Sequence, residues 1–329
     1  MKAVGLLSGG LDSTLALKII LRQGIEVIAL NFFTPFCRCI RGGCSWAKRQ
    51  ADHLKIPIKT VYLGEEYLEI VKNPKFGYGS QLNPCIDCRI LMFRRAREFM
   101  KEVSASFIIT GEVLGQRPMS QNPRALRLIE REAGLDGLIV RPLSAKLLPP
   151  SLPEEKGWIK REELLAIRGR SRKKQMRIAV EVGLQDYPSP AGGCLLTDPG
   201  FAKRMKDLME HSPNFTLEDV ELLKIGRHFR LAPETKLVVG RNYSENTVLQ
   251  KMLGKGNVML YIEEFKGPIA IMKGKTSTEL LKTAARIMVR YSDAPQNAEV
   301  KVSYKSNNIL DFIKVKPAEV NEVEKFLVK

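Results

Sequence analysis

Short apolar runs alternate with stretches of helical periodicity through the first 145 residues of the chain. The runs are rich in Val, Ile, Leu and Phe, which is typical of buried strands, and they lie at residues 3–7, 26–33, 58–63, 106–110 and 138–140. Helices are predicted between them at residues 14–22, 46–54 and 86–103. Because strands that alternate with helices form parallel sheets, we predict an α/β fold built on a parallel sheet.

The rest of the chain has a different pattern. A basic stretch with predicted helices at residues 160–166 and 171–182 follows the last of these strands. Beyond residue 214 the pattern predicts an α+β domain with helices at residues 216–225, 243–252, 276–290 and 318–328 and strands at residues 229–240, 258–271, 299–304 and 309–315. We therefore divide the chain into residues 1–145, 146–214 and 215–329.

The first predicted strand runs into a glycine turn that opens a helix. Its sequence is Ser8-Gly9-Gly10-Leu11-Asp12-Ser13. Two glycines let the backbone approach an anion closely, and free N–H groups at a helix start point at it. Asp12 is a candidate ligand of Mg²⁺ or a residue that orients the loop. The turn is neither a Walker A loop nor the dinucleotide-binding pattern, so it is a phosphate-binding turn of another kind or an ordinary Gly-rich turn.

Charge and cysteine content narrow the class of protein. The 329 residues contain 53 Lys and Arg against 36 Asp and Glu, a net charge of +17. This imbalance favours a polyanionic partner, and we expect nucleic acid rather than a membrane surface. No apolar run approaches the ~20 residues that span a bilayer. We expect a cytoplasmic protein, in which the six cysteines serve metal or redox chemistry rather than disulfides.

The cysteines fall in three separate stretches. Cys85 and Cys88 lie at the predicted start of a helix, where we expect the helix dipole and Arg89 to stabilise thiolates. Cys194 follows two glycines on a turn. A third group, whose spacing matches no common zinc signature, has a role in metal binding or sulfur relay or none at all: Cys37, Cys39 and Cys44.

The Ser8–Ser13 turn resembles the PP-loop of the ATP pyrophosphatase superfamily, an adenine nucleotide alpha hydrolase-like fold. Together with the Asn-Pro-Cys-Ile-Asp-Cys motif at residues 83–88 and Cys194, it makes the first 200 residues similar to the tRNA-specific 2-thiouridylases. The resemblance implies ATP and Mg²⁺, adenylation of a uridine carbonyl oxygen, and replacement of that oxygen by sulfur. It also implies nucleotide contacts from Ser8, Gly9, Gly10, Asp12, Ser13, Asn31, Phe32, Thr110 and Gly111.

The same resemblance assigns catalytic roles to Cys88, Cys194 and Asp12. With Cys85, the two cysteines resemble the ligand set of sulfurtransferases that hold a 4Fe-4S cluster. In the alternative mechanism, Cys194 carries a persulfide that Cys88 resolves. Either mechanism requires the thiols to meet at the mouth of the nucleotide pocket. The implied partners are tRNA and a sulfur donor, either sulfide or a persulfide carrier protein, with no membrane; a homodimer is left open.

The C-terminal part resembles the RNA-binding domain of NFACT proteins, through residues 237–242 and Glu245-Asn246. The resemblance implies RNA contacts by Arg227, His228, Arg230, Arg241, Asn242 and Lys255, against the alternative of a dimerisation module. Two other functions stay open from the sequence alone. One is a PP-loop zinc enzyme acting on a small deazapurine-type substrate, and the other is a non-catalytic RNA-binding protein.

Overall fold

The computed structural model describes residues 1–38, 45–184, 186–188, 193–254, 256–306 and 309–328. The chain forms two compact units, Met1–Thr197 and Asp198–Lys329, each with its own core. We describe each unit by itself. No helix in the described part of the chain is long and apolar enough to cross a membrane.

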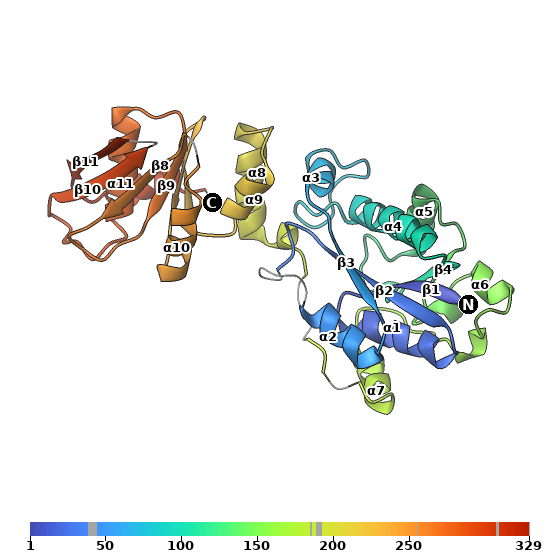
Figure 1. Cartoon of the computed structure of the whole chain (residues 1–329). Coiled ribbons are helices and arrows are strands. Elements are labelled where there is room, and N and C mark those ends of the chain that lie inside the picture. The colour runs from blue at the N-terminus through green and yellow to red at the C-terminus, as the bar shows by residue number, and fades with distance from the viewer. Residues whose placement is uncertain (39–44, 185, 189–192, 255, 307–308, 329) are drawn as a thin grey trace. The chain divides into compact units, whose positions relative to one another are not determined.

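A five-stranded sheet forms the centre of the first unit (Figure 1), and all its neighbouring strands pair in parallel. The strand order is β3-β2-β1-β4-β5, so the chain starts in the middle of the sheet and moves outward in both directions. The α/β prediction is thereby confirmed. The strands are β1 (Lys2–Leu6), β2 (Glu26–Phe33), β3 (Ile58–Tyr62), β4 (Phe107–Ile109) and β5 (Ile139–Val140).

Helices cover both faces of this sheet (Figure 1). One face packs against α1 and α2, and the other against α4 and α5. Strand β1 shows how alternation divides its side chains, since Ala3 joins the first core and Val4 the second. The helices of the unit are α1 (Leu11–Arg22), α2 (Ser45–Leu54), α3 (Glu65–Lys72), α4 (Cys85–Glu102), α5 (Pro123–Ala133), α6 (Leu152–Glu155) and α7 (Lys173–Glu181).

Glycines at two positions let the Ser8–Ser13 loop and the helix after it lie close to the sheet. A Cβ on Gly5 would lie 2.4 Å from Leu17 Cδ2, so the glycine lets α1 lie close to β1. A Cβ on Gly111, just beyond β4, would lie 2.5 Å from the backbone nitrogen of Ser13. The loop after β4 therefore rests directly on the first turn of α1 and fixes its position.

Residues 146–197 pack on this unit rather than standing apart from it. The predicted helix at residues 160–166 is wrong, because the segment makes only the 3₁₀ turn Arg161–Glu163. Its apolar residues Ile159, Leu164 and Ile167 are buried in the core beside α1. These residues are five and three positions apart, which is close to the spacing of apolar residues in a helix. The sequence pattern therefore did not distinguish a helix from an irregular segment that crosses the core.

The second unit is built on a six-stranded sheet with antiparallel pairing throughout its described strands. Its order is β11-β10-β8-β9-β7-β6. The strands are β6 (Arg227–Ala232), β7 (Thr235–Val239), β8 (Val258–Ile262), β9 (Ala270–Gly274), β10 (Val300–Ser306) and β11 (Ile309–Val315). The helices are α8 (Pro199–His211), α9 (Leu217–Leu222), α10 (Tyr243–Lys251), α11 (Thr278–Val289) and α12 (Val320–Phe326).

The predicted α+β class of this unit is confirmed, with two corrections. The stretches at 229–240 and 258–271, each predicted as a single strand, contain two separate strands apiece, β6 with β7 and β8 with the start of β9. Both turns carry signals that the prediction overlooked, Pro233-Glu234 in the first stretch and Gly267-Pro268 in the second. The strands beside them are strongly apolar, and β7 is buried on both faces. In β7, Leu237 and Val239 pack with α11, whereas Val238 packs on the other face with Leu249 of α10.

A buried ion pair in the first unit predicts a large effect on stability. Arg141 Nε donates to Glu112 Oε2 at 3.0 Å, both side chains are buried, and Arg141 also pairs with Glu130. Arg141→Met leaves a buried carboxylate with only a 3.5 Å contact to Arg89. We expect the free energy of unfolding to fall by about 3 kcal/mol.

Urea unfolding followed by tryptophan fluorescence measures this, because both tryptophans, Trp46 and Trp158, belong to the first unit. The matched control is Arg95→Met, whose guanidinium pairs with Glu66 and Glu98 at the surface. It should cost less than about 1 kcal/mol. Equal losses for the two variants would contradict the role given to burial.

Candidate functional site

A cavity of about 240 Å³ opens at the carboxyl ends of β1 and β2. In parallel α/β sheets this edge is where ligands bind. Ser8 follows β1, and Asn31 and Phe32 lie near the end of β2, and all three line the cavity. Its cysteine side comes from three further segments and consists of Cys37, Cys85, Cys88 and Cys194.

The loop between β1 and α1 is tied together by its serines. Ser8 and Ser13 hydroxyls lie 3.1 Å apart, and the Ser13 hydroxyl donates to the Gly10 carbonyl at 2.9 Å. Gly10 is the N-cap of α1, and no side chain caps this helix end by a hydrogen bond. Gly9 adopts φ +78°, and a Cβ there would meet the backbone of Ala47 at 2.6 Å. The loop thus presents backbone N–H groups at a helix start, as anion sites do.

Asp12 lies in the first turn of α1 with basic and amide neighbours. Gln116 Nε2 donates to its Oδ2 at 3.0 Å, and Arg172 Nε lies 3.7 Å from the same oxygen. The other oxygen, Oδ1, is buried with no hydrogen-bond partner among the described residues. A buried carboxylate oxygen without a donor is costly unless a ligand satisfies it. Carboxylate oxygens are the ligands that Mg²⁺ takes, so Asp12 is suited to hold that ion.

Asn31 offers a second unsatisfied acceptor. Its Nδ2 donates to the Leu7 carbonyl at 2.8 Å, which fixes the side chain, while its buried Oδ1 has no partner among the described residues. Leu7, Leu30 and Phe32 line the cavity around it. An apolar slot with one fixed acceptor suits a planar base that carries an amino group.

Backbone hydrogen bonds bring the third cysteine segment to this cavity. Leu195 N–H donates to the Phe36 carbonyl at 2.8 Å, and Cys37 and Cys194 form an isolated antiparallel bridge. Leu82 N–H donates to the Leu196 carbonyl at 3.2 Å. Cys194 therefore lies on the same cavity as Cys85 and Cys88, as the chemistry predicted from the sequence requires. Cys39 and Cys44 lie outside the described residues.

Burial controls the charge of these thiols. It raises the pKa of Cys88, against the lowering effects of a hydrogen bond with Tyr67 and of Arg89. Burial raises the pKa of Cys85 too, against Arg117 and Arg89, and it raises that of Cys194 to about 12. The expectation that the helix start and Arg89 would stabilise thiolates at Cys85 and Cys88 is therefore wrong, because desolvation raises both pKa values.

Two arginines face the thiols. Arg89 and Arg117 both line the cavity, and the charge of Arg89, with burial, lowers the pKa of Arg117. Arg89 contacts the buried Glu112 at 3.5 Å, but Glu112 is also bonded to Arg141. One carboxylate is thus shared among several guanidinium groups. This arrangement leaves a local excess of positive charge that an anion would neutralise.

Tyr67 and Cys37 are site residues that the sequence reasoning missed or left open. Tyr67 comes from α3, which was not predicted, and its buried hydroxyl is hydrogen-bonded to Cys88. The spacing Tyr67-Leu68 with Val71, all buried, is the helical signal that could have placed it. The loop after β4 adds further residues to the site. Gln116 donates to Asp12, Arg117 and Ser120 line the cavity, and Gln121 accepts from Arg117 N–H at 3.0 Å.

Three cysteine thiols on one cavity are the soft donor set that iron–sulfur clusters take. Cys85, Cys88 and Cys194 therefore fit such a cluster in chemistry, and all three line the same cavity. In the described residues, however, no group of three or more His, Cys, Asp or Glu side chains is already arranged to hold a metal ion. The thiols must lose protons and move together on binding, as is usual when binding is coupled to folding.

Not every predicted nucleotide contact lines the cavity. Gly9, Gly10, Asp12 and Ser13 belong to the adjoining loop, and Gly111 packs on its backbone. Thr110 is buried at the end of β4, where its N–H donates to Val140. These residues surround the cavity rather than forming its described lining, and their contacts with a nucleotide stay a prediction.

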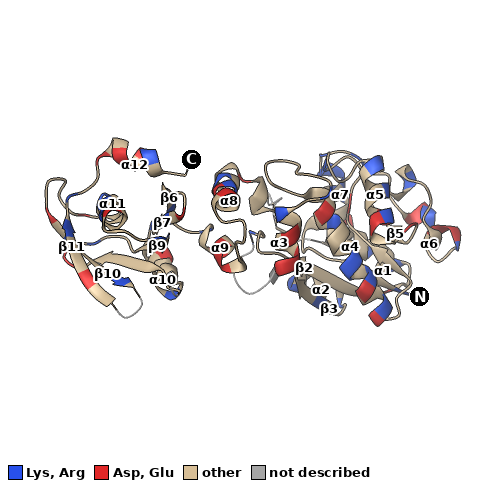
Figure 2. Cartoon of the chain, turned by 90° about the horizontal axis from the view of Figure 1, so that it is seen from above, with Lys and Arg blue, Asp and Glu red and all other residues tan. Residues whose placement is uncertain are grey.

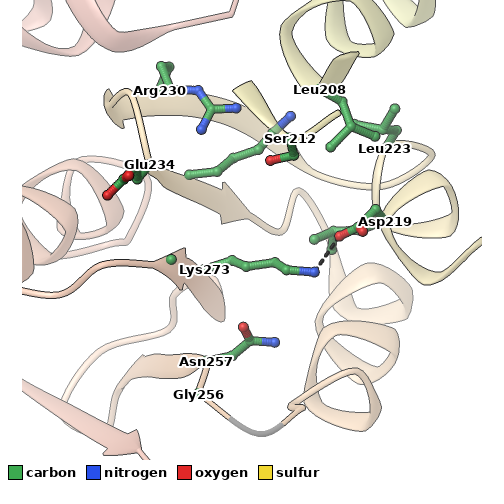
Figure 3. Close-up of a pocket in the computed structure, with 12 residues that line it drawn as sticks. Leu208, Ser212, Asp219, Leu223, Arg230, Glu234, Gly256, Asn257 and Lys273 are labelled. Carbon is green, nitrogen blue, oxygen red and sulfur yellow. Dashed lines mark hydrogen bonds and ion pairs between the residues drawn. The ribbon is translucent and has the colours of Figure 1, made fainter. Parts of the chain in front are cut away.

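The second unit has a cavity of about 320 Å³ between α8, α9 and the sheet (Figure 3). Each of its charged side chains is held in an ion pair. Lys273 of β9 pairs with Asp219 of α9, while Arg230 and Lys236 both bind Asp207 at 2.8 Å. These cations hold the pKa of Asp207 at about 2 against the opposing effect of burial. The cavity is therefore lined by structural ion pairs.

Several side chains that the sequence suggested as RNA contacts are bonded within the second unit. His228 is 2% exposed and bonded to the Ile225 carbonyl, so its prediction as an RNA contact is wrong. Arg230 is held by Asp207. Arg241 pairs with Glu245, and Asn242 caps α10 by accepting from Glu245 N–H at 3.0 Å. Lys255 lies outside the described residues.

Comparison with known proteins shows that the two ends of the chain are similar to two different families. Residues 1–146 match the family described as "Thiamine biosynthesis protein (ThiI)", and residues 226–327 match "NFACT protein RNA binding domain". Over 121 residues the chain is 32% identical to a "Probable tRNA sulfurtransferase" of Methanosarcina mazei, which covers 35% of this chain and 29% of that protein. Over 120 residues it is 35% identical to the "tRNA-specific 2-thiouridylase MnmA" of Coxiella burnetii, which covers 33% of each.

Among solved structures, one described as "Crystal structure of a 4-thiouridine synthetase - RNA complex with bound ATP" aligns with a TM-score of 0.38 and 23% identity, over 56% of this chain and 41% of that chain. The chain spans about a third of the length of the curated relatives it matches. The two resemblances inferred from the sequence are thus confirmed: the first unit is similar to PP-loop tRNA sulfurtransferases, and the second to the NFACT RNA-binding domain.

Proposed function

We propose that this chain uses ATP to replace a carbonyl oxygen of a tRNA uridine with sulfur. The observation that carries the proposal is the meeting of Ser8 and Asn31 with Cys85, Cys88 and Cys194 on one cavity. A nucleotide loop beside several thiols suits a reaction in which ATP activates an oxygen and sulfur displaces it. The similarity to tRNA sulfurtransferases supports the choice of tRNA as substrate.

The first step is adenylation. The uridine oxygen attacks the α-phosphorus of ATP, an O–P bond forms, and pyrophosphate leaves. The N–H groups at the start of α1 and the Ser8 and Ser13 hydroxyls would bind phosphate oxygens. Asp12 would hold Mg²⁺, which would offset the charge of the phosphates. The Arg89 and Arg117 guanidinium groups would stabilise the negative charge that develops in the transition state.

The second step forms the carbon–sulfur bond. A sulfur nucleophile attacks the activated carbon, and AMP leaves with the oxygen. In the persulfide mechanism, Cys194 receives the outer sulfur of a persulfide donor, and this sulfur is the nucleophile that bonds to the base carbon. Cys88 then attacks the Cys194 sulfur and breaks its bond to the transferred sulfur, which stays on the base. The Cys88–Cys194 disulfide that forms is reopened by a thiol reductant. Alternatively, a 4Fe-4S cluster held by Cys85, Cys88 and Cys194 would supply an open iron site for sulfide.

The proposal is tested with anaerobically reconstituted protein, tRNA, ATP and sulfide or a persulfide donor. We expect a thionucleoside by mass spectrometry of digested tRNA with the intact chain, and none with Cys88→Ala or Cys194→Ala. Cys85→Ala distinguishes the two sulfur routes, because only the cluster requires it. Absence of any thionucleoside from the intact protein would refute the function, and a brown chromophore lost in Cys88→Ala would support the cluster.

Asp12→Asn should abolish the activation step, because the amide cannot hold Mg²⁺ with a full charge. We expect thionucleoside formation and pyrophosphate release to fall by roughly 100-fold or more, as on removal of other charge-stabilising groups. tRNA affinity should be unchanged. Asp52→Asn is the control, since Asp52 pairs with Lys48 on the exposed surface. Full activity of Asp12→Asn would contradict the role of Asp12.

The raised pKa of Cys194, about 12, predicts slow alkylation of the protein before it is loaded with sulfur or metal. At pH 8 the fraction of Cys194 present as thiolate falls about tenfold for each unit by which its pKa exceeds that of a free thiol. We therefore expect iodoacetamide to modify Cys194 roughly 100-fold or more slowly than free cysteine, with a rate still rising above pH 9. Peptide mass spectrometry measures it. A rate that levels off below pH 8 would contradict the effect of burial.

A further inference from the structure

The sheet of the second unit has one face closed by helix α11 along its outer strands (Figure 2). Helix α11 packs against β8, β10 and β11. The side chains that meet it alternate along each strand and include Leu260, Val300 and Val302, all fully buried. Because successive side chains in a strand point to opposite faces, the residues between these belong to the other face.

The strand register assembles that other face. Ser303 of β10 pairs with Tyr261 of β8 on one side and with Phe312 of β11 on the other. The next row contains Met259, Lys305 and Leu310. Lys301 and Lys314 form a further pair at one end. We call this set the outer-strand face: Met259, Tyr261, Lys301, Ser303, Lys305, Leu310, Phe312 and Lys314.

The outer-strand face carries large exposed apolar groups on β11, whereas Ser303 at its centre is buried. Phe312 is 48% exposed and Leu310 67% exposed, and Lys305 and Lys314 are exposed too. Lys301 Nζ lies 4.6 Å from the Phe312 ring centre. Elsewhere on this side of the sheet, α10 packs against β9 and covers Ile271. An exposed aromatic among lysines on a sheet is the chemistry that binds unstacked bases and their phosphates.

Charge excludes a second copy of the same face as the occupant. Two outer-strand faces packed together would oppose Lys301, Lys305 and Lys314 with their own copies, and like charges repel. The nearby Glu263 carboxylate, which accepts from the Ser303 hydroxyl at 3.1 Å, offsets only one of the three lysine charges. Asp311 belongs to the opposite side of β11, where it pairs with Tyr304. The face therefore requires a partner that is both anionic and aromatic.

We propose that the outer-strand face binds single-stranded RNA. Bases stack on Phe312 and Tyr261, and phosphates pair with Lys301, Lys305 and Lys314. The two aromatic side chains are two strands apart, about 10 Å, which suits bases spread from one another rather than stacked in a duplex. The inference rests on the proposed function only in taking this RNA to be an unpaired segment of the tRNA substrate.

Binding is measured with the full chain and a fluorescein-labelled oligouridylate of roughly 12 nucleotides, by fluorescence anisotropy. We expect Phe312→Ala to weaken binding about tenfold, the effect of losing one base–aromatic stack. Phe312→Tyr should keep the affinity. Lys305→Ala should weaken binding and reduce the slope of log affinity against log salt by about 0.7, the value for one phosphate contact of a single strand.

The matched control is Ile309→Ala, because Ile309 is also exposed on β11 but belongs to the opposite side of the strand. It should bind as the unaltered chain does. Equal affinity of Phe312→Ala and Ile309→Ala would overturn the inference. So would a dimer in light scattering that Phe312→Ala dissociates while leaving RNA affinity intact.

The thionucleoside assay separates this inference from the proposed function. A chain that thiolates tRNA but binds RNA equally well with Phe312→Ala keeps the function and loses the inference. A chain whose oligouridylate binding depends on Phe312, yet which makes no thionucleoside, keeps the inference and loses the function. Circular dichroism should be unchanged in each variant, since these side chains are exposed.

Discussion

Main-chain hydrogen bonds between segments far apart in sequence hold the cysteine cavity together. Leu195 reaches Phe36, and Leu82 reaches Leu196, through N–H and carbonyl groups. Such bonds fix the course of the chain without depending on side chains, and the buried groups would be costly to leave unpaired. They bring the turn of Cys194 back to the end of the parallel sheet. The meeting of Cys194 with Cys85 and Cys88 on one cavity follows from this return of the chain.

The cavity combines neutral thiols with an excess of guanidinium groups. Burial raises the pKa of Cys85 and Cys88 against the lowering effect of the neighbouring arginines. The charge of Arg89 also lowers the pKa of Arg117. An anion bound beside these two guanidinium groups would relieve the repulsion between them.

Local signals in the sequence predicted the first unit well. The apolar runs, the glycine loop and Pro84 before α4 act over a few residues, and each strand of the parallel sheet was located from them. The segment from 160 to 166 was misassigned, because residues that cross a core also recur every three to five positions. Tyr67 could not be linked to Cys88, since only tertiary packing brings α3 to α4. The pKa of the thiols was misjudged for the same reason, as burial depends on the whole fold.

The second unit shows that residues which stand out in the sequence can serve the structure of their own helix. Arg241, Asn242 and Glu245 stand out in the sequence, but they cap and brace α10. His228 and Arg230 alternate along β6 as exposed residues would. In the structure, however, Asp207 of α8 binds Arg230, and His228 is buried. The outer-strand face, in contrast, is composed of residues from three strands that only the register aligns. Because pairing between strands is set by the fold, no local pattern in the sequence could have grouped these residues.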